Sequence, residues 1–139
     1  MKNYHEDSRL LKPVDIEKLE KAFELSWSKE TCLPANQAQW SPGNKACGQC
    51  AVTVLVVNDL YGGKIAYDKE HDHYWNILPD GSQHDFSRMQ SAEGTKHTRT
   101  AIKERKDILD SNGALKAQTP QRYGLLKMKV LQALKTLSH

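Results

Sequence analysis

Several features that mark specialised classes of protein are scarce or missing in this sequence. The most apolar stretch, residues 51–57, is far shorter than the roughly 20 apolar residues that cross a bilayer, so no membrane segment is expected. Residues 1–7 contain no apolar h-region, so no secretory signal is expected either. The three cysteines are an odd number, which favours reduced thiols over a disulfide framework. Together these absences predict a cytoplasmic protein.

The composition that is present suits one small globular domain. With 139 residues, 38% apolar and 27% charged, the chain is long enough to bury a single core. We expect a polar leader over residues 1–12 and a single α+β domain over residues 13–139. Residues 96–139 carry ten Lys and Arg against three Asp and Glu. These cations are dispersed and are not interleaved with aromatic side chains, which favours a solvated helical face over a nucleic-acid surface.

Periodicity predicts amphipathic helices near both ends of the domain. Residues 15–27 and 119–137 repeat apolar side chains at spacings of three and four. Asp15 is the expected cap of the first helix, and Thr119 caps the second. Residues 28–47 lack periodicity and are expected to form a loop, and a weaker helix is predicted over residues 100–109. The apolar stripes are Ile16, Leu19, Phe23 and Trp27 in the first helix and Tyr123, Leu126, Val130, Leu134 and Leu137 in the last.

The central segment combines one buried element with strand-like sequence. Residues 50–60 are apolar on nearly every side; their β-branched content favours a strand, but their length favours a buried helix, which we predict. Three short strands are expected over residues 64–67, 73–78 and 84–87, with Pro79-Asp80-Gly81 as the turn before the last. If residue 78 pairs with residue 83, Asp85 lies opposite Asn76.

Residues 46–51, Ala-Cys-Gly-Gln-Cys-Ala, hold the side chains with the clearest chemical potential. Cys50 opens the predicted helix, where the helix dipole and unpaired backbone N–H groups favour a thiolate and can bind an oxyanion. A buried structural cysteine is the plain alternative. Cys47-x-x-Cys50 also allows a redox dithiol, or a zinc site completed by Cys32 and a histidine, although the spacing fits no standard zinc motif.

A reactive cysteine needs an imidazole base and a group that orients the imidazole. His73 opens the predicted strand after the buried helix and is preferred as the base over His71, which lies in the charged stretch 68–72. Asp85 on the returning strand is the predicted orienting carboxylate, and Asn76 is the alternative. In the expected register, Asp85 reaches His73 only if the strands shift or the loop is wider.

Two enzyme resemblances attach to these residues. Residues 44–50, Asn-Lys-Ala-Cys-Gly-Gln-Cys, resemble the papain-type segment that leads into a catalytic helix. That resemblance implies Cys50 as the nucleophile and Asn44 in the place of the glutamine that helps to bind the oxyanion. The order of a cysteine on a helix, His-Tyr-Trp at residues 73–75 and Asp85 on the next strand is similar to the transglutaminase-like core.

A wider resemblance covers most of the chain and implies the fold and the site rather than a reaction. It is to the YunG-like family of small bacterial proteins. The segments that carry it are Gly48–Thr53, Val56–Asp59, Gly62-Gly63, His73–Gly81, Asp85–Ser87 and Arg122–Leu126.

The sequence therefore favours an α+β fold with a papain/transglutaminase-like, cysteine-proteinase-type core, in which a buried helix packs on a small antiparallel sheet with flanking helices. The leading function is a thiol hydrolase or acyltransferase of the amidase, deamidase or peptidase type, acting on an amide- or acyl-bearing protein, peptide or small molecule. No cofactor, metal, membrane or nucleic acid is expected. The alternative is a non-catalytic binding module on the same fold that uses the basic C-terminal helices. The predicted site residues are Cys50, His73 and Asp85, supported by Asn44, Gln49 and Asn76.

Overall fold

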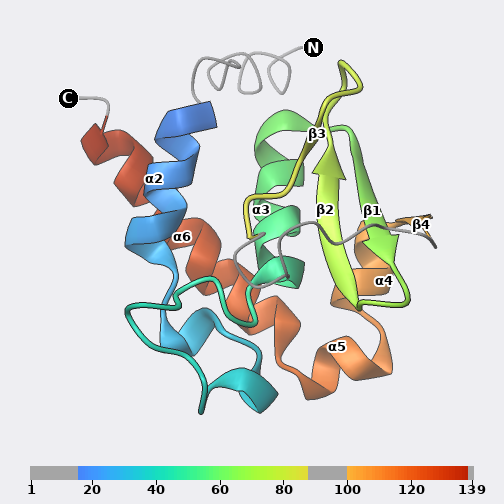
Figure 1. Cartoon of the computed structure of the whole chain (residues 1–139), viewed down its shortest axis with the longest axis horizontal. Helices are drawn as coiled ribbons and strands as arrows, with labels where there is room; N and C mark the ends of the chain where they lie inside the picture. The colour runs from blue at the N-terminus through green and yellow to red at the C-terminus, as the bar shows by residue number, and fades with distance from the viewer. Residues whose placement is uncertain (1–15, 88–99, 138–139) are drawn as a thin grey trace.

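A buried helix lies between a small sheet and a pair of helices from the two ends of the domain (Figure 1). The computed structural model describes residues 16–87 and 100–137. The architecture is α+β, and each strand pairs antiparallel with its neighbour in the spatial order β3-β2-β1-β4. The strands are β1 (Lys64–Asp68), β2 (His73–Ile77), β3 (Gln83–His84) and β4 (Thr100–Lys103).

The helices surround the sheet unevenly. In Figure 1, α2 and α6 run side by side along one flank of α3, whereas the short α4 and α5 lead from β4 to α6. No helix in the described part of the chain is long and apolar enough to cross a membrane. The helices are α2 (Ile16–Ser26), α3 (Cys50–Tyr61), α4 (Arg105–Leu109), α5 (Asn112–Lys116) and α6 (Thr119–Leu137), with 3-10 turns η2 (Lys29–Thr31) and η3 (Pro34–Asn36).

The predicted amphipathic helices at the two ends of the domain are confirmed. In α6 the side chains of Leu126, Val130 and Leu134 are buried, and they pack with Phe23 of α2 in one hydrophobic cluster. Asp15, the expected cap of α2, and the predicted leader over residues 1–12 lie outside the described residues. The predicted loop over residues 28–47 contains the turns η2 and η3.

The prediction of a buried helix after residue 49 is also confirmed, because α3 runs from Cys50 to Tyr61. Its apolar side chains point in all directions, as expected for a helix that is covered on every side. One side joins the cluster with α2 and α6, and the other packs on the sheet and α4 through Val54, Leu55, Ile65 and Ile108. Because α3 is held from both sides, its first residue has a fixed place relative to the sheet.

The predicted helix over residues 100–109 is wrong in its first half. Thr100–Lys103 forms β4, a fourth strand that pairs with residues 65–68 of β1, and only Arg105–Leu109 is helical. Without β4 the outer edge of β1 would present unpaired N–H and C=O groups. The sequence predicts that this helix ends near Asn112, but α4 ends at Leu109. A second short helix, α5, begins at Asn112 and is capped by the Ser111 hydroxyl.

The predicted register of the last hairpin is wrong by one residue. Asn76 pairs with His84 rather than with Asp85, and β3 ends at His84 instead of continuing to residue 87. The reason is the turn: Leu78 N–H donates to Ser82 O, so the loop contains three residues instead of four. Gly81 at its end has φ +89°, the left-handed conformation that three-residue hairpin loops require.

Candidate active site

Cys50 is the first residue of α3, and its thiol is nine-tenths buried. The amides in the first turn of an α-helix have no partner within the helix, and the dipole gives this end partial positive charge. A sulfur at this position therefore lies where a thiolate, or an oxygen that gains negative charge beside it, is favoured.

His73 is the first residue of β2, and its imidazole joins two of the predicted site residues. Its Nε2 lies 2.6 Å from Asp85 Oδ2, and the ring is also hydrogen-bonded to the Cys50 thiol. The imidazole is only 3% exposed, and it stacks alongside the Trp75 ring at a centroid distance of 6.5 Å. Cys50, His73 and Asp85 thus lie in one connected group.

Charge in this group favours the protonated imidazole. Burial alone would lower the pKa of His73, but the hydrogen bonds and charges of Asp85 and Cys50 outweigh it and raise that pKa to about 10. The second carboxylate oxygen of Asp85, Oδ1, is buried and has no hydrogen-bond partner in the described part of the chain. The imidazolium is therefore the cation that balances a half-buried carboxylate.

The corrected hairpin register explains how Asp85 reaches His73. In the expected register Asp85 would share a face with Asn76, and therefore not with His73. The actual pairing shifts every residue after the turn by one position, and a one-residue shift moves each side chain to the other face. Asp85, directly after β3, then follows the face of Trp75 and His73, where a diagonal neighbour is within reach.

Matched element lengths bring His73 back to the level of Cys50. The 12 residues of α3 rise about 18 Å, and the five of β1 span about 17 Å in the opposite direction. The reversal depends on Gly63, whose φ is +83° and where a Cβ would lie 2.2 Å from Ile77 O. This tight turn accounts for an interval of only 23 positions between Cys50 and His73.

The three predicted supporting residues have different surroundings. Gln49 is fully buried; its Oε1 accepts from Thr31 Oγ1 at 2.9 Å and its Nε2 donates to Ser28 O at 3.0 Å. Asn76 donates from Nδ2 to Val54 O at 3.1 Å and so ties β2 to α3. Asn44 is half-buried in a turn, where its N–H donates to Ser41 O. Gln49 and Asn76 therefore hold the chain segments that carry Cys50 and His73.

His71, the rival base, belongs to another pair. Its Nδ1 lies 2.7 Å from Asp68 Oδ2, and its imidazole is 41% exposed. Asp68 is fully buried and also accepts the backbone N–H of Glu70 at 3.0 Å. These contacts stabilise the turn between β1 and β2, which delivers His73.

The other two cysteines lie beside each other. Burial and the neighbouring Cys47 raise the pKa of Cys32 to about 11, and the two thiols are hydrogen-bonded. A thiol with a raised pKa is a poor nucleophile at neutral pH. Across residues 16–87 and 100–137, no group of three or more His, Cys, Asp or Glu is arranged to hold a metal ion.

A cavity of about 360 Å³ opens beside Cys50. Sequence reasoning assigned no role in the site to the other polar residues that line it. One of them had a signal in the sequence: Arg122 continues the spacing of four that places Leu126, Val130 and Leu134 in the core. The polar lining includes Asp72, Tyr74, Asp107, Ser111, Thr119 and Arg122.

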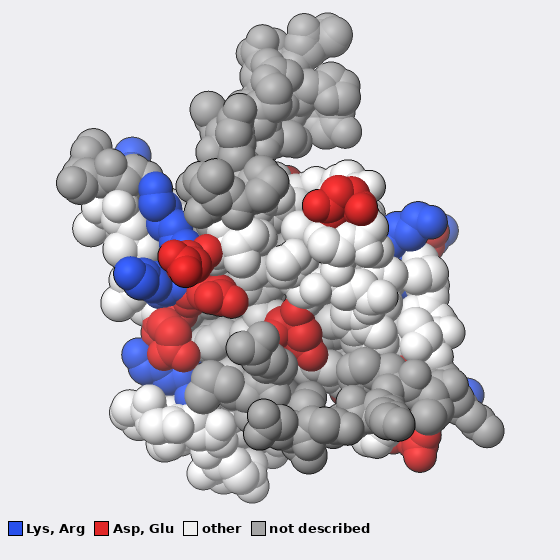
Figure 2. Space-filling view, turned by 45° about the horizontal axis from the view of Figure 1, so that its top comes forward, with Lys and Arg blue, Asp and Glu red and all other residues white. Residues whose placement is uncertain are grey.

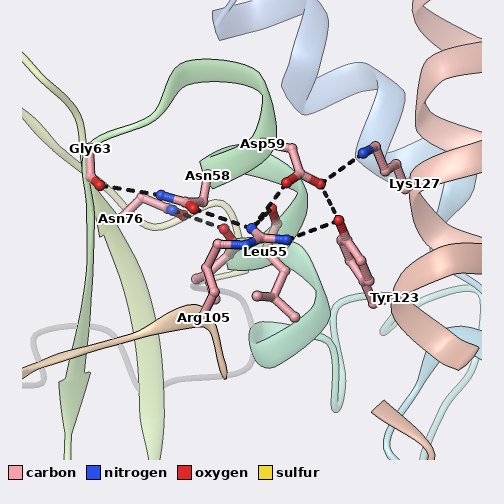
Figure 3. A network of polar contacts seen from close by, with 9 residues as sticks. Leu55, Asn58, Asp59, Gly63, Asn76, Arg105, Tyr123 and Lys127 are labelled. Carbon is pink, nitrogen blue, oxygen red and sulfur yellow. Dashed lines mark hydrogen bonds and ion pairs between the residues drawn. The ribbon is translucent and has the colours of Figure 1, made fainter. Parts of the chain in front are cut away.

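A polar network fixes the elements that form the cavity wall (Figure 3). Asp59 on α3 binds Arg105 at 3.0 Å and Lys127 at 3.1 Å, and it accepts a hydrogen bond from Tyr123. Arg105 also donates to Leu55 O at 3.1 Å. Because α4 and α6 are thereby attached to α3, the cavity residues that they carry keep their positions relative to Cys50.

This network also bears on the basic C-terminal third of the sequence. Arg105 and Lys127 are both bound to Asp59, and Lys103 lies 5.2 Å from the centre of the Tyr67 ring. Figure 2 shows acidic and basic side chains interspersed over the described part of one face. Several basic side chains of the C-terminal third are thus engaged in ion pairs or ring contacts within the fold.

Comparison with known proteins relates the chain to one family. A family model described as YunG protein matches residues 15–135. The "Uncharacterized protein YunG" of Bacillus subtilis (strain 168) is 27% identical over 99 residues, which are 70% of this chain and 81% of that relative. No solved structure matches.

Proposed function

The chain belongs to the YunG protein family, and from that premise and the geometry around Cys50 we propose that it is a thiol hydrolase or acyltransferase. Cys50 is the proposed nucleophile, His73 the acid and base, and Asp85 the group that orients His73. The observation that carries the proposal is the connected group itself: an imidazole 2.6 Å from a carboxylate and hydrogen-bonded to a thiol at a helix N-terminus. The residue types and their order along the chain support the proposal of a papain/transglutaminase-like core.

The contacts suggest how each group would act. Asp85 engages His73 Nε2, so Nδ1 is the ring nitrogen that would exchange a proton with Cys50. The raised pKa of His73 keeps the imidazole protonated near pH 7, and this positive charge would stabilise negative charge on the Cys50 sulfur. The Trp75 ring lies alongside the imidazole, with 6.5 Å between the two ring centroids.

The proposed reaction proceeds through a thioester. The Cys50 thiolate attacks the substrate carbonyl carbon, and the carbonyl π electrons move to the oxygen, which the first-turn amides of α3 stabilise. The oxyanion collapses, the bond to the leaving amine breaks, and the His73 imidazolium gives that amine its proton. Water or a second amine then attacks the thioester, His73 takes the proton of the attacking group, and the Cys50 thiolate leaves.

Two reagents test the proposal. Iodoacetamide should alkylate Cys50 of the native protein at pH 6, with the label assigned to Cys50 rather than Cys47 by fragment mass spectrometry. The activated ester p-nitrophenyl acetate should release p-nitrophenol in a burst and leave an acetyl group on Cys50, and Cys50→Ser should abolish the burst.

An unreactive Cys50 in the folded protein would overturn the proposal. Alkylation without an acetyl intermediate would also overturn the enzyme and would favour the binding module. Cys47→Ser is the matched control, because it removes a neighbouring buried thiol and should leave both reactions unchanged.

A further inference from the structure

Arg122 is a buried cation whose contacts are all with neutral groups. It is only 4% exposed. Its Nε donates to Ala117 O at 2.9 Å, one Nη to Thr31 O at 3.0 Å and the other to Thr119 Oγ1 at 3.2 Å. These three bonds satisfy part of the guanidinium, which has five N–H donors, so each Nη keeps one further N–H.

No carboxylate neutralises this charge among the residues that the structure describes. A buried charge is costly unless it is paired, and arginine in a protein interior is usually paired with an acid. Burial lowers the pKa of Arg122, and the groups that act in the opposite direction are the thiols of Cys32 and Cys50. Both thiols therefore act electrostatically on the guanidinium, and one of them, Cys50, belongs to the candidate site.

Arg122 lines the same cavity as Cys50. At about 360 Å³, the cavity is at the lower end of the size range of ligand pockets and suits a group about as large as an amino-acid residue. The two carboxylates that also line it differ from Arg122 because they are exposed, and Asp72 already accepts a hydrogen bond from Tyr67 at 2.6 Å. The cavity is thus lined by one buried cation, Arg122, and by two exposed carboxylates.

We infer that Arg122 binds a carboxylate of the substrate, so that the preferred substrate is an acyl or amide compound with a carboxylate close to the scissile carbonyl. The C-terminal residue of a peptide has this chemistry. The inference rests on the proposed function, since it assigns the substrate class of the Cys50 site. A guanidinium fork matches the two oxygens of a carboxylate, and charge-assisted bonds of this kind are stronger than neutral ones.

The test compares two alkylating reagents of nearly equal size at Cys50. Iodoacetate carries a carboxylate beside its reactive carbon, whereas iodoacetamide is neutral. The measured quantity is the ratio of the iodoacetate rate to the iodoacetamide rate, determined by mass spectrometry at Cys50. We expect this ratio to be about tenfold higher in the folded protein than in the same chain unfolded in urea, and the iodoacetate rate to saturate.

Variants assign the effect to Arg122. Arg122→Gln should lower the ratio about tenfold, whereas Arg122→Lys, which keeps the charge but loses the planar fork, should retain only part of it. Lys129→Gln removes a cation from the same helix but outside the cavity lining, and it should leave the ratio unchanged. Asp72→Asn and Asp107→Asn should raise the ratio slightly, because each removes a negative charge at the cavity.

The outcomes separate the two proposals. If Cys50 reacts with iodoacetamide but the folded and unfolded chains give the same ratio, the carboxylate site is wrong and the thiol enzyme stands. If Cys50 reacts with neither reagent, both are wrong. If Arg122→Gln does not fold, Arg122→Lys takes its place, because the His73 imidazolium beside Cys50 is unchanged in that variant and any fall in the ratio is then due to Arg122.

Discussion

Two His–Asp pairs in this molecule have almost the same length and opposite settings. His73–Asp85 measures 2.6 Å and His71–Asp68 measures 2.7 Å. The first joins residues 12 positions apart, its imidazole is 3% exposed, and a thiol is hydrogen-bonded to the ring. The second joins residues three positions apart in a turn, and its imidazole is 41% exposed. The two pairs do not differ in their N···O distance. They differ in how far the imidazole is buried and in whether a thiol also interacts with the ring.

The largest expected difference between the two pairs is in their effect on the reactivity of the Cys50 thiol. His73→Ala should slow alkylation of Cys50 by iodoacetamide at pH 6 by about 100-fold, because the imidazolium no longer stabilises the thiolate. His71→Ala is the matched control, and its rate should stay within about twofold of wild type because the His71 imidazole, which is 41% exposed, is paired with Asp68 rather than with the Cys50–His73–Asp85 group. Equal effects of the two substitutions would show that the pairs do not differ in function.

Of the two carboxylates, Asp85 should matter more for the alkylation of Cys50, whereas Asp68 should matter more for stability. Asp85→Asn should slow Cys50 alkylation about tenfold at pH 6, since the imidazolium loses its balancing charge. Asp68→Asn should leave that rate unchanged but lower the free energy of unfolding by about 1–3 kcal/mol, because a buried acceptor of backbone N–H groups is altered. Urea unfolding measures the stability, and a slower alkylation in Asp68→Asn would contradict this division.

The pH dependence of stability sharpens the comparison further. In a Cys50→Ala background no thiol exchanges a proton with the imidazole, and we expect the hydrogen bond and charge of Asp85 to hold the pKa of His73 above the ordinary value of about 6.5. The folded chain then keeps a proton that the unfolded chain releases. The stabilisation from His73 is full below pH of about 6.5 and is lost as the pH rises through the folded pKa.

Urea midpoints of the Cys50→Ala protein between pH 6 and pH 10 should accordingly fall with increasing pH. Adding His73→Gln should flatten this part of the profile, whereas adding His71→Gln should leave the fall in place. A midpoint that rises over the same range in the His73-containing protein would contradict the sign of the effect.

The smallest expected effect is that of replacing Trp75, whose ring lies alongside the His73 imidazole. Trp75→Phe keeps an aromatic ring beside His73 but removes the hydrogen bond from Trp75 Nε1 to Gln83 Oε1, which measures 2.8 Å. We expect a loss of about 1 kcal/mol in unfolding free energy and less than about threefold in the alkylation rate. Thermal unfolding and the same labelling assay measure both, and a loss as large as that of His73→Ala would mean that Trp75 takes part directly.

The parts of this molecule that local sequence determines were predictable. The α3 helix follows from a run too apolar for any surface and too long for a strand, and Cys50 and His73 were chosen by their positions at element starts. The contact of Asp85 depended on a single residue in the hairpin loop, which the turn residues alone left open.

Two other features were missed because distant segments decide them. Residues 100–103 have weak periodicity, and the free edge of β1 makes them a strand. Arg122 reads as one of many basic residues until α6 docks, and only then is it buried beside Cys50. Tertiary contacts override local propensity at both places.

The hydrogen bond from Arg122 to Thr31 O joins residues 91 positions apart and has a consequence for synthesis. Chains emerge from the ribosome N-terminus first, so Cys50, His73 and Asp85 are all made well before Arg122. A nascent chain therefore contains the proposed nucleophile and base before Arg122 is made. If Arg122 selects the substrate as we infer, that selectivity is acquired last, when α6 docks and Arg122 bonds to Thr31.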